Sequence, residues 1–279
     1  MDNKRVSILG CGWLGTALGE YLVSKGYSVK GSTTHKEKLD GLRAKGMEPF
    51  LINLLPQVKG NIADFLDSDV LIVDIPPSAA DTGKMDTFHA TQMENLTDEI
   101  LKVSVRKTIY ISSTSVYPNN NKDVSEGTEV KQDFSRMAKM LLLAESVMRR
   151  CIPLDCTVLR LGGLIGFDRI PGKYRMPLRS LQSAKSKINY IHRDDAIMVI
   201  EQVIAQNKWN KLYNVVAPQH PTREEIYLQN GARFSFNPPE LNETQDAKYK
   251  VVRSDKLVKE LKYEFKYPNP LEFYYEYKE

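Results

Sequence analysis

Short apolar runs alternate with amphipathic helical patterns over the first 160 residues. The runs predict strands at Val6–Leu9, Tyr27–Gly31, Pro49–Ile52, Val70–Asp74, Thr108–Ser112 and Cys156–Leu161. The patterns between them predict helices at Leu14–Lys25, Lys36–Lys45, Met85–Val103 and Asp133–Arg150. Strands this short and apolar are typical of a sheet that is covered on both faces. The alternation therefore predicts an α/β fold with a doubly wound parallel sheet.

The pattern changes after residue 162. The stretch "GGLIGFDRIPGKYRMP" is rich in Gly and Pro and predicts a loop. A strand at "INYI", a helix from Asp195 to Gln206 and a strand at "LYNVV" are expected to follow. We expect residues 1–165 to form the first domain, with 191–216 returning to its sheet, and 166–279 to form a smaller lobe.

Three glycines lie between the first strand and the first helix. Gly10, Gly12 and Gly15 are spaced G-x-G-x-x-G. The first glycine permits a tight turn, the second lets the backbone approach a pyrophosphate, and the third lets helix and strand pack closely. Together with Trp13, which precedes the predicted helix, and Leu14, which begins it, they form the predicted binding site for a dinucleotide. The alternative is a glycine-rich turn with no ligand.

The second strand ends in "KGSTTHKEK" and carries no acidic residue before Glu37. An NAD-selective site has Asp or Glu here to accept from the ribose 2′-OH. Ser32, Thr33, His35 and Lys36 instead donate hydrogen bonds, which favours the 2′-phosphate of NADP and leaves NAD as the alternative. The spacing Thr34-x-x-Glu37 also predicts a capping box, and both readings can hold together.

The charge, cysteine content and apolar runs of the sequence exclude several classes of function. The 39 basic and 35 acidic residues of the 279 are interspersed, and they give a net charge of +4. They form no stripe for nucleic acid and no patch for a membrane surface. Cys11, Cys151 and Cys156 have no metal-site spacing, so we expect no metal and a reducing cytoplasm. The first residues lack the apolar length of a signal peptide, and no run approaches a membrane span.

Five segments occur in a telling order: "GCGWLG", "SSTSVY", "RLGGLIG", "YIHRDDA" and "LYNVV". With them the chain resembles the extended short-chain dehydrogenase/reductase superfamily, in its NAD-dependent epimerase/dehydratase branch, and within it an atypical subgroup. The resemblance covers about the first 220 residues. It implies a Rossmann-type domain with a small C-terminal α/β substrate lobe. It also implies an NAD(P)-dependent oxidoreductase or epimerase acting on a small carbonyl, alcohol or nucleotide sugar.

The resemblance also implies a catalytic set. Ser113, four residues before Tyr117, takes the position that hydrogen-bonds the reacting oxygen. A Tyr-x-x-x-Lys pair on the next helix normally supplies the acid or base and holds the nicotinamide ribose. Here Lys139 has Ser135 four residues before it; counted from "AES", the two positions are instead Met137 and Leu141. Neither register contains a tyrosine, and Phe134 has the ring without the hydroxyl.

Two further groups are weighed as proton donors. His192 can act as an acid or base near neutrality, or it can be a packed residue while Asp194 and Asp195 cap the following helix. Tyr174, in the Gly/Pro-rich stretch, can lend a hydroxyl. Tyr117 is expected to pack behind the site.

Two classes of function therefore stay open. The first is an NADP(H)-preferring enzyme with a small-molecule substrate, no nucleic acid partner and no membrane; a homodimer is left open. The second is a non-catalytic NADP(H)-binding or sensing protein, which the missing tyrosine favours.

Overall fold

The computed structural model describes residues 4–77, 87–131, 135–151, 154–173, 180–242 and 248–276. The chain divides into two compact units. The first contains Met1–Val116, Lys131–Arg160 and Ile200–Leu212; the second contains Tyr117–Val130, Leu161–Val199 and Tyr213–Glu279. Each unit is described below by itself.

A seven-stranded sheet has the order β11-β7-β5-β4-β1-β2-β3. Its strands are β1 (Arg5–Leu9), β2 (Ser28–Thr33), β3 (Glu48–Leu51), β4 (Val70–Val73), β5 (Lys107–Ser113), β7 (Asp155–Leu161) and β11 (Leu212–Val215). β1 pairs in parallel with both β2 and β4, so the order reverses between β1 and β4. This is the doubly wound order of Rossmann folds, and it confirms the predicted fold class.

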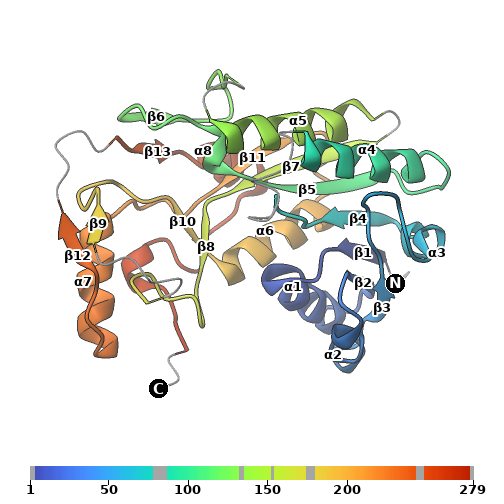
Figure 1. Cartoon of the computed structure of the whole chain (residues 1–279), viewed down its shortest axis with the longest axis horizontal. Helices are drawn as coiled ribbons and strands as arrows, with labels where there is room; N and C mark the ends of the chain where they lie inside the picture. Colours follow the sequence, from blue (N-terminus) through green and yellow to red (C-terminus); the bar gives the residue numbers. More distant parts are fainter. Residues whose placement is uncertain are drawn as a thin grey trace. The chain divides into compact units, whose positions relative to one another are not determined.

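The helices alternate with these strands along the chain. They are α1 (Trp13–Ser24), α2 (Leu39–Ala44), α3 (Ile62–Leu66), α4 (Phe88–Ile100), α5 (Arg136–Arg150), α6 (Arg193–Ala205), α7 (Arg223–Phe234) and α8 (Asp255–Leu261). In the first unit, α4 packs against α5, and Figure 1 shows this pair on the opposite face of the sheet from α1. The strands are apolar because both of their faces are covered: all four residues of β4 are buried.

The core of the first unit forms where these layers meet. Phe65, Leu71, Met93, Tyr110 and Met148 are fully buried in one apolar cluster. They come from α3, β4, α4, β5 and α5 in turn. The cluster lies beneath the strand ends that carry the candidate site, so it fixes the positions of those ends.

Among its described residues, the second unit contains short strand pairs, helices α7 and α8 and the start of α6. β6 (Lys122–Val124) pairs with β13 (Lys250–Val252), β8 (Gly163–Ile165) with β10 (Tyr190–His192), and β9 (Ser180–Gln182) with β12 (Glu240–Asn242). Three-residue strands are too short for a period of two to appear in sequence. For that reason the prediction of loop throughout 162–177 is wrong at β8, which pairs in parallel with β10.

Other departures have equally local causes. The sequence reading missed α3, which is only five residues long, and α7, whose apolar stripe is weak. α7 is nevertheless well capped, since Thr222 and Glu225 form a capping box. Residues 85–86 and 133–134, predicted as helix starts, lie outside the described residues.

No helix in the described ranges is long and apolar enough to span a membrane. No group of three or more His, Cys, Asp and Glu side chains in the same ranges is arranged to hold a metal ion.

Candidate functional site

The turn from β1 into α1 requires two of its glycines for folding. Gly10 has φ +105°, and a Cβ there would lie 2.3 Å from the carbonyl oxygen of Asp74. A Cβ on Gly15 would lie 2.4 Å from the carbonyl oxygen of Gly10. Neither distance is compatible with a side chain, so these two glycines hold the loop tightly against the end of β4.

Gly12 differs from its neighbours. A Cβ on Gly12 would meet no protein atom within 4 Å, and the residue is exposed. Gly12 is the N-cap of α1, and no side chain caps that end of the helix. The first N–H groups of a helix carry partial positive charge and suit an anion such as a diphosphate. The open space over Gly12 has the form that the glycine motif predicts for a dinucleotide cradle, and the residues present fit that ligand.

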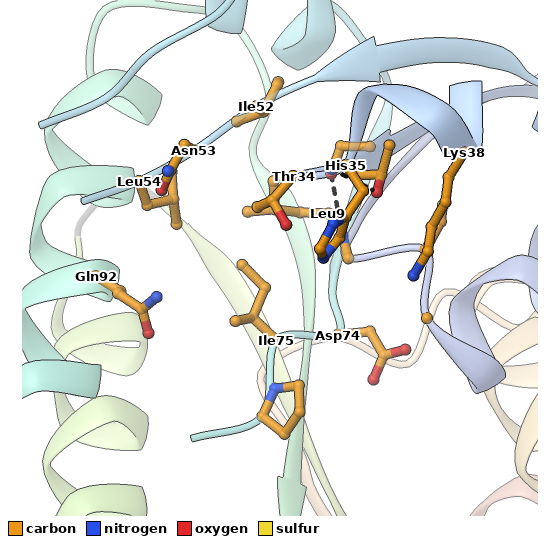
Figure 2. Close-up of a pocket in the computed structure, with 16 residues that line it drawn as sticks. Leu9, Thr34, His35, Lys38, Ile52, Asn53, Leu54, Asp74, Ile75 and Gln92 are labelled. Carbon is orange, nitrogen blue, oxygen red and sulfur yellow. Dashed lines mark hydrogen bonds between the residues drawn. The ribbon is translucent and has the colours of Figure 1, made fainter. Parts of the chain in front are cut away.

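A pocket surrounds this loop (Figure 2). It lies where β1, β2, β3 and β4 end, which is the switch point where open α/β sheets bind ligands. Its walls are Leu9, Gly10, Cys11, Gly12, Ser32, Thr33, Thr34, His35, Lys38, Ile52, Asn53, Leu54, Asp74, Ile75, Pro76 and Gln92. All of these residues belong to the first unit.

The wall formed by the end of β2 carries hydroxyl and basic groups. Ser32 Oγ accepts a hydrogen bond from the Gly10 N–H at 3.0 Å, and the Ser32 carbonyl accepts one from the Cys11 N–H at 2.7 Å. Ser32 thereby ties the glycine loop to β2. Beyond it, Thr33 Oγ1 accepts from the His35 N–H at 3.2 Å.

The structure modifies two expectations for this segment. The capping box at Thr34 and Glu37 is wrong, because the short 3₁₀ turn η1 (Lys36–Lys38) has His35 as its N-cap and no side-chain cap. Within that turn Lys38 lines the pocket, whereas the exposed Lys36 is not among the lining residues. In Figure 2 the Lys38 side chain runs along the rim of the pocket, beside His35.

Asp74 supplies the acidic group of the pocket, directly after β4. Its carboxylate lies close to the glycine loop, since Oδ2 would be 3.2 Å from a Cβ on Gly15. Burial, followed by the charge of Asp74, raises the pKa of the Cys11 thiol to about 12. The Cys11 sulfur faces Gly31, where a Cβ would lie only 2.9 Å from it. Cys11 is thus a packed thiol beneath the loop.

The far wall is apolar with two amides. Ile52, Leu54 and Ile75 provide the apolar surface, and Asn53 and Gln92 provide the amides. The backbone here is anchored by α4, because Asn95 Nδ2 donates to the Leu54 carbonyl at 2.7 Å. A surface of this kind suits an uncharged planar ring rather than a phosphate.

Two of the predicted cofactor residues do not face the pocket. Leu14 is 4% exposed and belongs to the core, and Trp13 is half-buried. Neither side chain is part of the pocket wall. They begin α1, so their contribution to a ligand would come through backbone N–H groups.

Ser113 lies at the end of β5, as predicted, and its hydroxyl bonds to the nearby Ser115. Its Oγ accepts from the Ser115 N–H and donates to Ser115 Oγ, both at 3.1 Å. The neighbouring Ser112 instead points into the protein and donates to Glu145 Oε1 at 2.5 Å. Arg160 completes this buried group by two hydrogen bonds to the Glu145 carboxylate, at 3.0 and 2.7 Å.

Helix α5 packs near the end of β5 and contains no tyrosine. It packs against β5 and against η3 (Thr114–Val116). Ser135 is its N-cap, and Ser135 Oγ accepts from the Ala138 N–H at 3.1 Å; Lys139 is half-buried one turn on. In the other register, Met137 is 36% exposed and Leu141 is 2% exposed. No residue of α5 in either register carries a phenol.

His192 lies in the second unit and is fully buried. Its Nδ1 accepts from the Asp194 N–H at 3.2 Å, which leaves Nε2–H to donate to the Tyr274 carbonyl at 3.1 Å. Burial lowers its pKa. These contacts support a structural role for His192 rather than a catalytic one.

The acidic pair after His192 lies in the first turn of α6. Asp195 accepts from the Tyr263 hydroxyl at 2.7 Å, the Lys266 N–H at 2.8 Å and the Tyr267 N–H at 3.0 Å. It therefore anchors the C-terminal segment to α6. Tyr174 and Phe134 lie outside the described residues.

Several residues that line the pocket were not predicted from the sequence as part of a site: Lys38, Asn53, Leu54, Asp74, Ile75, Pro76 and Gln92. Most of them directly follow β3 or β4, so the rule that ligands lie at the carboxyl ends of parallel strands could have found them. Gln92, within α4, gave no such signal.

No protein-family model matches this chain. Protein YeeZ of Escherichia coli (strain K12) is 29% identical over 272 residues, which covers 96% of this chain and 98% of that protein. Among solved structures, the UDP-glucuronic acid 4-epimerase of Bacillus cereus in complex with NAD superposes with a TM-score of 0.78 at 17% identity, covering 97% of this chain and 94% of that one.

A short-chain dehydrogenase/reductase superfamily protein from Agrobacterium tumefaciens with bound NAD superposes with a TM-score of 0.76 at 15% identity, covering 94% and 93%. At these identities the likeness establishes the fold. The chain has the fold of NAD-dependent epimerase/dehydratase and short-chain dehydrogenase/reductase proteins, as the sequence resemblance implied.

Proposed function

We propose that this chain binds a nicotinamide dinucleotide in the glycine-loop pocket and prefers the phosphate-bearing form, NADP(H). The observation that carries the proposal is the open space over Gly12, beside an uncapped helix N-terminus at the switch point of the sheet. Fold neighbours with bound NAD support the same ligand class.

The preference for the phosphate-bearing form rests on the wall that follows β2. Its pocket residues are Ser32, Thr33, Thr34, His35 and Lys38. All of them carry hydroxyl or basic groups that suit a 2′-phosphate, and none is the carboxylate that would accept from a 2′-OH. Lys38 takes the role that the sequence alone gave to Lys36.

For the reaction, we propose slow NADP(H)-dependent oxidoreduction or epimerisation of a small carbonyl, alcohol or nucleotide sugar. The bound nicotinamide would supply or accept the hydride. Ser113 would turn its hydroxyl proton from the exposed Ser115 Oγ to hydrogen-bond the reacting oxygen, and Lys139 would contact the ribose. We leave Ser135 and His192 out, because the first caps α5 and both ring nitrogens of the second are engaged. We assign substrate binding to residues 166–279 and expect the protein to work in the cytoplasm.

The test is NADPH oxidation against a panel of quinones, aldehydes, ketones and nucleotide sugars. Ser113→Ala should lower the turnover found, while NADPH affinity stays within about threefold because Ser113 does not line the pocket. Ser24→Ala, at the exposed C-terminal end of α1, is a matched loss of a serine hydroxyl outside β5. Rapid turnover that Ser113→Ala leaves unchanged would place the reaction elsewhere.

A second function, NADP(H) binding or sensing without turnover, is favoured by α5. That helix has no phenol, and the hydroxyl of Ser135 is already used as the cap. If NADPH raises the melting temperature while no member of the panel is reduced, the protein is a binding protein rather than an enzyme.

A further inference from the structure

A buried chain of hydrogen bonds leads from the sheet to the pocket wall. Tyr110, on β5, and His89, on α4, are both 0% exposed. The Tyr110 hydroxyl lies 2.8 Å from His89 Nε2, and His89 Nδ1 lies 3.0 Å from Gln92 Oε1. Gln92 is one turn along α4 from His89 and lines the pocket. The ring of His89 therefore connects the sheet interior to the ligand site.

The direction of these bonds follows from the tyrosine. Among the described residues, the Tyr110 hydroxyl has His89 as its hydrogen-bond partner. A fully buried O–H that donates to nothing is costly, so Tyr110 must donate to Nε2. A neutral imidazole carries one N–H, which must then be on Nδ1. Burial, reinforced by the charge of Glu145, raises the pKa of Tyr110 well above its ordinary value, which keeps the donor protonated.

The Nδ1–H in turn fixes the amide of Gln92. It can donate only to the oxygen of that amide, so Oε1 must face His89. The Nε2H₂ group is on the other side of the same planar amide and is available to the pocket. Figure 2 shows the end of the Gln92 side chain opposite Ile75, across the apolar part of the pocket.

We propose that Tyr110, His89 and Gln92 form a relay that holds the Gln92 amide in one orientation, and that Gln92 uses it to select the base of the bound dinucleotide. This inference rests on the proposed function. The Gln92 Nε2H₂ group donates to a ring nitrogen of the base. The second lone pair of Gln92 Oε1 accepts from the exocyclic amine beside that nitrogen. Adenine presents this acceptor–donor pair, whereas hypoxanthine has a carbonyl in place of the amine. Ile52, Leu54 and Ile75 supply the apolar surface against the ring.

The first test compares the affinity for NADPH with that for its hypoxanthine analogue, by fluorescence titration. We expect the native protein to prefer NADPH by at least about fivefold, the lower limit for a bidentate amide–base pair. Gln92→Met keeps the length of the side chain without the amide and should reduce the preference to within twofold. Glu94→Gln, on the exposed side of the same helix, is the control and should retain it.

The second test acts on the relay at its far end. Tyr110→Phe removes a buried hydroxyl that does not line the pocket, so a merely structural role would change both affinities together. The relay predicts instead that the preference for adenine falls, because His89 is free to move its proton to Nε2 and Gln92 to turn over. Long-range proton–nitrogen NMR of His89 should show Nδ1–H in the native protein and lose that pattern in Tyr110→Phe.

The outcomes separate the two claims. If the native protein binds neither dinucleotide, the proposed function fails and this inference fails with it. If it binds both equally, or if Gln92→Met retains the preference, the base selection is overturned while the proposed function stands. A native His89 with its proton on Nε2 overturns the relay.

Discussion

The glycine-loop pocket and helix α5 lie in the same unit, and they differ in how far their residues match those expected of a dinucleotide-dependent enzyme. In the pocket, Gly10 and Gly15 meet strict steric demands, and Gly12 leaves open the space a diphosphate needs. In α5, both candidate acid positions have lost the phenol, and Ser135 serves the helix as its cap. The contrast is that the pocket keeps the shape of a dinucleotide site, whereas neither candidate position at the start of α5 carries a phenol.

A side chain at Gly12 should separate these regions most sharply. Gly12→Val should weaken NADPH and NADH by at least about a hundredfold, because the branched side chain would fill the diphosphate space. Folding should be little affected, because a Cβ there meets nothing within 4 Å. Titration calorimetry and thermal melting would measure the two effects.

Gly41→Val is the matched control for Gly12→Val. Gly41 is also exposed, with nothing within 4 Å of its would-be Cβ, but it is on α2 away from the pocket wall. Gly12→Val binding NADPH as tightly as Gly41→Val would remove the loop from the site.

Restoring a phenol to α5 should have the next largest effect. A well-placed general acid contributes about 10²–10⁴-fold, so Ser135→Tyr, four residues before Lys139, should raise NADPH-dependent turnover at least about tenfold even with imperfect placement. Ser135 is half-buried at the N-terminus of α5, which leaves room for the ring. Ser135→Phe loses the same helix cap and adds the ring without the hydroxyl. Equal rates in these two variants would show that the missing phenol does not limit the reaction.

A smaller effect should distinguish the two lysines after β2. Lys38→Ala should weaken NADPH by about 1 kcal/mol, or roughly fivefold, and leave NADH unchanged, because one exposed charge-assisted contact to the 2′-phosphate is lost. Lys36→Ala is the control, since Lys36 is not part of the pocket wall. Selective loss in Lys36→Ala alone would restore the assignment made from the sequence.

The last effect concerns the stability of the fold rather than the pocket. Burial lowers the pKa of His192, so the unfolded chain takes up this proton at a higher pH than the folded chain does. Stability should therefore be complete above pH ~6.5 and fall as the pH falls toward the lowered value. Burial lowers the pKa of His220 with the same sign, and it raises that of Asp195 with the opposite sign.

The loss should stay near or below about 1.4 kcal/mol per pH unit per histidine, the limit for one proton. Urea unfolding at pH 7 and at pH 5 would measure it. His192→Gln should reduce the difference between the two pH values, and His35→Gln, at an exposed histidine, should not. Stability that rises on acidification would contradict the buried neutral state of His192.

The sequence revealed those features that depend on local pattern. The strands of the sheet were predicted to within about two residues, because both faces are covered and each strand is a continuous apolar run. The glycine loop was also predicted, because its three glycines lie within six consecutive residues. Short elements such as α3 and β8 were missed, because neither is long enough to show a period.

The remainder of the site depends on contacts that are distant along the chain. Choosing Lys38 over Lys36 requires the geometry of a 3₁₀ turn, and Thr33 rather than Thr34 accepts the backbone bond there. The partnership of His89 with Tyr110 joins residues 21 apart, from a helix and a strand. Likewise, Ser112 and Glu145 meet across 33 residues. No pattern within one element predicts such pairs.

The most direct test of this account is a titration of the unmodified protein with NADPH and, separately, with NADH. The account predicts saturable binding of NADPH at one site per chain, tighter than that of NADH, because the open space over Gly12 and the basic wall with Lys38 act on the same ligand. Absence of saturable binding, or NADH binding as tightly as NADPH, would contradict it.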